Sequence, residues 1–121
     1  MRRLILALAL LTSGVAVAAD SSTFQLRNAD DLVVACSVPQ DHALYANATG
    51  FCHGLLVGAY SYYNATVSAE NRFICTPTPV PTRAKVMNEF VAWAKSRPQY
   101  MNDPPLDALS RYLAETYPCR K

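Results

Sequence analysis

Apolar residues recur at helical spacing in four blocks of the chain, and prolines or polar stretches separate these blocks. The four blocks are residues 28–36, 44–63, 82–96 and 103–117. In the third block Val86, Phe90 and Trp93 share one side of a helix, whereas charged residues occupy the other side. Such a pattern is typical of an amphipathic helix, and strand-type alternation is weak throughout. The sequence therefore predicts an all-α fold, a small four-helix domain.

Residues at the block boundaries fit helix starts. Asn28, Thr82 and Asp103 each precede an apolar-periodic block, and short polar side chains of this kind cap helix N-termini. The two prolines that follow Asp103 fit a first helical turn, where no backbone N–H is needed. Asp107 and Arg111 stand four residues apart in the last block, which predicts an ion pair on the helix surface.

The second block is apolar nearly all round, which is typical of a central helix that is covered on every side. Gly50, Gly54 and Gly58 recur every four residues in it. The interpretation taken from this spacing is close packing against a neighbouring helix. The apolar stretch 50–63 is too short to cross a bilayer, which takes about 20 residues.

The N-terminus has the pattern of a cleaved export signal. Arg2 and Arg3 precede an apolar run, and small residues at 16–19 end it before Asp20. This predicts a signal peptide at 1–19, a single mature domain at 20–121, a periplasmic location and no stable membrane anchor after cleavage. Removing two of the 11 basic residues leaves nine against nine acidic ones, so the mature formal charge is zero. A nucleic acid partner is not expected from this balance.

Four cysteines lie in the predicted mature domain: Cys36, Cys52, Cys75 and Cys119. An even number in a small exported chain predicts two disulfides, and the wide spacing argues against a metal site. A short turn joins the last two predicted helices, so they should run antiparallel. Cys75 and Cys119 then arrive at the same end of this helix pair. The expected bonds are Cys75–Cys119 and Cys36–Cys52.

Few residues in the chain suit catalysis. The two histidines are His42 and His53, and the only cysteine next to one of them, Cys52, is expected to be oxidised. No pair of carboxylates and no glycine-rich phosphate loop stands out. We therefore expect no catalytic residue, no metal, no cofactor and no enzymatic activity.

A partner-binding site is predicted in the turn between the last two helices. This turn carries Gln99, Tyr100, Met101 and Asn102. Tyrosine is common at protein interfaces because it combines an apolar ring with a polar tip. Nothing in the pattern of this turn demands burial, so the four residues are the candidates for contact with another protein.

Three short motifs together resemble the Rap/Tai family, whose known members are periplasmic immunity proteins of type VI secretion amidase effectors. The resemblance covers roughly residues 30–119, and its motifs are Cys52-x-Gly54-x-x-x-Gly58, Phe73-x-Cys75-x-Pro77 and Tyr117-Pro118-Cys119. It implies an all-helical fold, intramolecular disulfides and a homodimer. It also implies a function, namely binding and blocking the active site of a peptidoglycan amidase.

Two other functions fit the same composition. One is a small periplasmic acid-stress chaperone of the HdeA-like kind, which is also helical and disulfide-bonded and would bind many clients at low pH. The other is an envelope accessory protein that has no toxin partner. Both alternatives stay open at the level of the sequence.

Overall fold

The computed structural model describes residues 20–120, so the predicted signal peptide at 1–19 lies outside the described residues. Its four α-helices are α1 (Ala29–Ala35), α2 (Tyr45–Thr66), α3 (Arg83–Lys95) and α4 (Pro105–Thr116). Three short 3-10 turns are η1 (Ser21–Phe24), η2 (Ala69–Asn71) and η3 (Pro98–Tyr100). Within the described chain the only strand-like pairing is one isolated bridge between Ile74 and Pro118. The all-α, four-helix prediction is confirmed.

Two of the three predicted helix caps are present. The side chain of Asn28 accepts a hydrogen bond from the backbone N–H of Asp31, and Thr82 accepts one from that of Lys85. The prediction for Asp103 was wrong, because Pro104 occupies the N-cap position of α4 and no side chain caps this helix. The backbone carbonyl of Asp103 accepts instead from the N–H of Ala29, at 2.8 Å.

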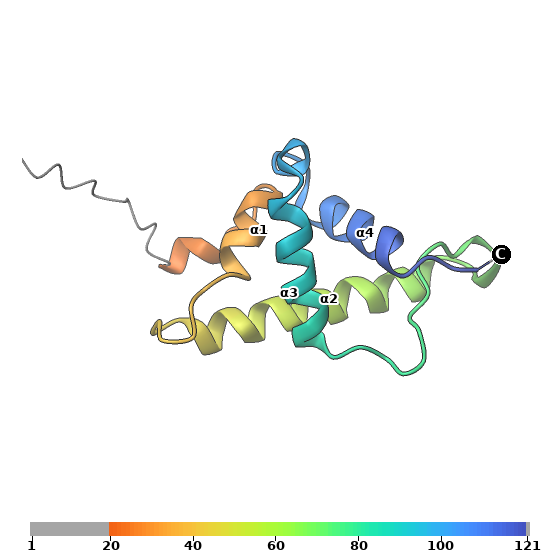
Figure 1. The fold of residues 1–121 in the computed structure, drawn as a ribbon, viewed down its shortest axis with the longest axis horizontal. Coiled ribbons are helices and arrows are strands. Elements are labelled where there is room, and N and C mark those ends of the chain that lie inside the picture. The colour runs from red at the N-terminus through yellow and green to blue at the C-terminus, as the bar shows by residue number, and fades with distance from the viewer. Residues whose placement is uncertain (1–19, 121) are drawn as a thin grey trace, which may run out of the picture.

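The core is formed mainly by α1, α3 and α4. In Figure 1, α3 stands between α1 and α4, and α2 runs beneath them. The largest fully buried side chains are Leu32 of α1, Phe90 of α3, and Leu109 and Tyr112 of α4. The rings of Phe90 and Tyr112 meet edge to face, with centroids 5.8 Å apart. The buried core therefore lies among α1, α3 and α4.

Helix α2 is peripheral rather than central, so this prediction was wrong. Its buried residues are Ala48, Cys52 and Leu56, which follow each other at one helical turn and form a single narrow stripe. The three glycines face away from the body: a Cβ added at any of them would meet no atom within 4 Å. The inferred close packing against a neighbouring helix is therefore absent within this subunit.

Helix α2 is also longer than predicted, because it continues to Thr66 through residues that were expected to begin a loop. Even so, no helix in the described part of the chain is long and apolar enough to span a membrane.

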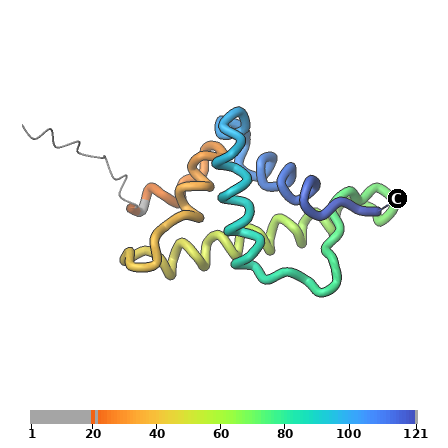
Figure 2. The backbone as a smooth tube through the Cα atoms, viewed as in Figure 1, coloured from red at the N-terminus to blue at the C-terminus, as the bar shows by residue number. Residues whose placement is uncertain are grey.

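Both predicted disulfides are present and no described cysteine is free. Cys36–Cys52 joins the end of α1 to α2, and Cys75–Cys119 joins the segment after η2 to the C-terminal tail. Next to the second bond, the N–H of Cys75 donates to the carbonyl of Tyr117, at 2.8 Å. Figures 1 and 2 show that α4 leaves the turn at an angle to α3 instead of folding straight back. The proline-rich segment 76–82 connects Cys75 to the start of α3.

Candidate functional site

The turn between α3 and α4, residues 96–104, is held against the start of α1. The N–H of Ala29 donates to the carbonyl of Asp103, and the N–H of Asp30 donates to that of Met101, at 3.0 Å. The first N–H groups of a helix have no partner within the helix, so carbonyls from elsewhere satisfy them well. The turn thus completes the N-terminus of α1, and two of its carbonyls are held there by hydrogen bonds.

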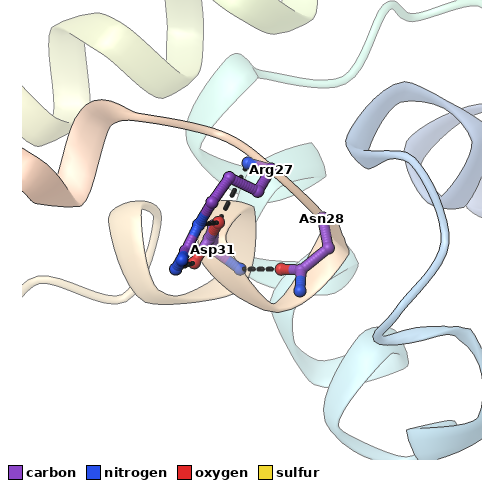
Figure 3. A network of polar contacts seen from close by, with 3 residues as sticks. All are labelled: Arg27, Asn28 and Asp31. Carbon is purple, nitrogen blue, oxygen red and sulfur yellow. Dashed lines mark hydrogen bonds and ion pairs between the residues drawn. The ribbon is translucent and has the colours of Figure 1, made fainter.

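The start of α1 is itself held by a local polar network (Figure 3). The Asp31 carboxylate accepts hydrogen bonds from the backbone N–H of Arg27, at 2.9 Å, and from its guanidinium, at 3.0 and 3.1 Å. Hydrogen bonds from Arg27 are the main cause of a lowered pKa for Asp31, because they favour the charged carboxylate. Asn28 caps the same helix. The network fixes the helix end on which the turn rests.

Tyr100 lies in a stack of planar groups. Its ring is nearly parallel to that of Trp93, with an interplanar angle of 9° and a centroid distance of 5.7 Å. The guanidinium of Arg111 lies over the Tyr100 ring at 4.4 Å, and that of Arg97 lies over the Trp93 ring at 4.8 Å. Guanidinium groups over aromatic faces are attracted by the ring quadrupole. The stack therefore holds Tyr100 by both aromatic and cationic contacts.

Glu115 of α4 links this stack to the last helix. Its carboxylate accepts a hydrogen bond from the indole Nε1–H of Trp93, at 2.7 Å. The same carboxylate oxygen lies 3.3 Å from a guanidinium nitrogen of Arg97. One carboxylate thus connects α3, the turn and α4.

The four predicted partner-binding residues lie together on this turn, but they are not equally accessible. Gln99 and Asn102 are exposed, whereas Tyr100 and Met101 are half-buried and pack against the core. The two polar residues are therefore the accessible ones, and the two apolar residues support the turn from within.

The stacking residues were missed by the sequence analysis. Arg111 was predicted to pair with Asp107, but the ion pairs found among the described residues do not include this one. Its guanidinium lies over Tyr100 instead. The contact between Arg111 and Tyr100 is hard to predict from the sequence, because it depends on where α4 lies relative to the turn.

A second distinctive surface lies on α2. Between Tyr45 and Thr66 this helix contains no Asp, Glu, Lys or Arg. Its outer face carries the three glycines together with two exposed apolar side chains, Val57 at 39% and Tyr62 at 72% exposure. We call this surface, comprising Gly50, Gly54, Val57, Gly58 and Tyr62, the glycine face. This face carries no charge and exposes two apolar side chains, so it is a candidate surface for contact with another protein.

No three His, Cys, Asp or Glu side chains within residues 20–120 are grouped so that they could hold a metal ion. With all four cysteines in disulfides, no described thiol is available as a nucleophile.

A family model described as Rap1a immunity proteins matches residues 28–119, which is most of the chain. No curated protein and no solved structure matches the chain.

Proposed function

The chain belongs to the Rap1a immunity protein family, and from this premise we propose that it binds and occludes a peptidoglycan amidase effector of type VI secretion in the periplasm. The family match over residues 28–119 is the observation that carries the proposal. In this function the chain performs no chemistry itself. It prevents catalysis by filling or covering the cleft of the effector.

The geometry of the turn supports this proposal. Its backbone is fixed on α1, and its aromatic residue is held in the stack with Trp93, Arg97 and Arg111. A surface that is already rigid loses little conformational entropy on binding, so more of its contact energy remains as affinity. We propose that Gln99 and Asn102, with the exposed part of Tyr100, contact the effector.

The proposal is tested by asking whether a neighbouring gene encodes an exported amidase, and by assaying the mature protein against that enzyme. The mature protein and this amidase are expected to co-purify, and release of peptides from peptidoglycan is expected to stop at one equivalent of the mature protein. Full amidase activity in the presence of excess mature protein would contradict the proposal.

Changing Gln99 and Asn102 together to arginine is expected to weaken inhibition about 100-fold or more. Two bulky charges would be forced into a contact region, and such buried unpaired charges cost several kcal/mol at an interface. The measurement is the inhibition constant against the amidase. The control is Thr116→Arg, an exposed residue at the end of α4, which should leave inhibition unchanged. If the double variant inhibits as well as the unaltered protein, the turn is not part of the interface with the amidase.

The homodimer that the family resemblance implies has a candidate interface in the glycine face. This surface is uncharged, so two copies can meet without burying an unpaired charge. Its glycines leave room for the backbones of two helices to approach closely, because a Cβ at these positions would meet no atom within 4 Å apart from those of its own helical turn. The exposed Val57 and Tyr62 add apolar area to bury. We propose that two α2 helices pack against each other through this face.

The variant Gly54→Glu is expected to convert the dimer to a monomer without unfolding it. Glutamate suits an exposed helix interior better than glycine by about 0.7 kcal/mol, so the fold should be at least as stable. In the dimer, however, it would bury a charge at the contact. Sedimentation equilibrium measures the mass, with Ser110→Glu on the exposed side of α4 as the control. A variant that remains dimeric would place the interface elsewhere.

A further inference from the structure

A cleft of about 360 Å³ opens where α3 crosses α2, away from the turn and the glycine face. It is lined by the end of α1, the first half of α2 and one side of α3. Along α3 its lining extends from Ala84 to Lys95, which corresponds to about 16 Å of helix. A cleft of this volume accommodates a short peptide segment, since ligand sites begin at roughly 300 Å³.

A disulfide lies in the wall of the cleft. The cleft's lining residues on α3 include Met87 and Val91, both on the side of the helix that faces α2. Cys36 and Cys52 both line the cleft, and their disulfide prevents α1 and α2 from separating at this point. The disulfide therefore fixes the wall of the cleft that α1 and α2 form.

The charge of the cleft has one sign. Among the described lining residues, Lys95 is the one that carries a permanent charge. None of the described residues that line it is acidic. The lining is mixed, with neutral hydrogen-bonding groups from Thr49 and Asn88 beside apolar side chains such as Val91. A ligand that fits this lining combines an apolar side chain with a carboxylate.

We infer that this cleft is a second docking site for the effector, and that it receives an acidic side chain next to an apolar residue on an effector loop. The inference rests on the proposed function, because it takes the effector as the source of the acidic segment. The cleft shares no lining residue with Gln99, Tyr100, Met101 or Asn102, so the two contacts are separate.

The cleft is tested first without the effector, by titrating the mature protein with the peptide N-acetyl-Leu-Glu-amide. The probe is the ¹³C-methyl signal of Met87, which lines the cleft, and Met101 in the turn is the internal reference. The Met87 signal is expected to shift with a dissociation constant on the order of 1 mM, while the Met101 signal stays in place. The uncharged peptide N-acetyl-Leu-Gln-amide should bind about fivefold more weakly. No shift of Met87, or equal binding of both peptides, would overturn the inference.

The second arm compares Lys95→Glu with Arg83→Glu, an exposed residue of the same helix that does not line the cleft. Only the first variant is expected to weaken binding of both the acidic peptide and the amidase, by about fivefold. If the peptide responds but the affinity for the amidase does not, the effector is not the occupant and the inference fails. If the amidase does not bind the unaltered protein at all, the proposed function fails, and the peptide titration still reports on the cleft.

Discussion

Replacing Cys75 and Cys119 together by alanine is expected to lower the free energy of unfolding by about 4 kcal/mol. The bond closes a loop of 44 residues, so it removes many conformations from the unfolded chain. Cys75 is exposed and Cys119 is half-buried, so their side chains contribute little packing that could be lost. A loss of about 4 kcal/mol is large for a domain of this size, whose total stability is typically about 5 to 15 kcal/mol.

Guanidinium unfolding followed by circular dichroism measures this effect. The midpoint should fall and the slope m should rise, because an unfolded chain without the bond exposes more surface. The comparison is the Cys36–Cys52 pair, which spans 16 residues and for which the same entropy model gives about 3 kcal/mol. A lower midpoint with an unchanged m for the Cys75–Cys119 variant would show that the bond acts on the folded state instead.

Truncating Trp93 to alanine is expected to destabilise the fold by about 4 kcal/mol, within the range for buried aromatic residues. The indole is only 9% exposed and contacts the rings of Phe90, Tyr100 and Tyr112, with centroids 5.7 to 6.3 Å away. Its loss would also leave Tyr100 without its stacking partner. The variant is therefore expected to loosen the turn as well as the core.

The matched control is Trp93→Phe. This change keeps an aromatic ring in the stack but removes the Nε1–H that donates to Glu115, so a smaller cost of about 1.5 kcal/mol is expected. Because Trp93 is the only tryptophan in the chain, unfolding is followed by circular dichroism rather than by fluorescence. The ¹³C-methyl signal of Met101 reports on the turn and should move more in the alanine variant. Equal stability of the two variants would mean that the stack does not support the core.

The sequence alone identified most of the local structure. Helix periodicity and the caps Asn28 and Thr82 depend on residues within a few positions of one another, so they can be read directly along the chain. The disulfide pairs also followed from the order of the helices, although α3 and α4 do not fold straight back on each other. The family was indicated by the spacing of cysteines, glycines and prolines, and the family match confirms it.

Tertiary structure decided which surfaces are open. Helix α2 is apolar on all sides, so its sequence gives no direction for the core, and only its packing shows that the glycines face outward. The sequence also placed Tyr100 in the turn, but its stacking between Trp93 and Arg111 depends on where α4 lies. The cleft likewise exists only because three helices meet there. Periodicity describes one helix at a time, whereas these surfaces arise from contacts between helices that are distant in the sequence.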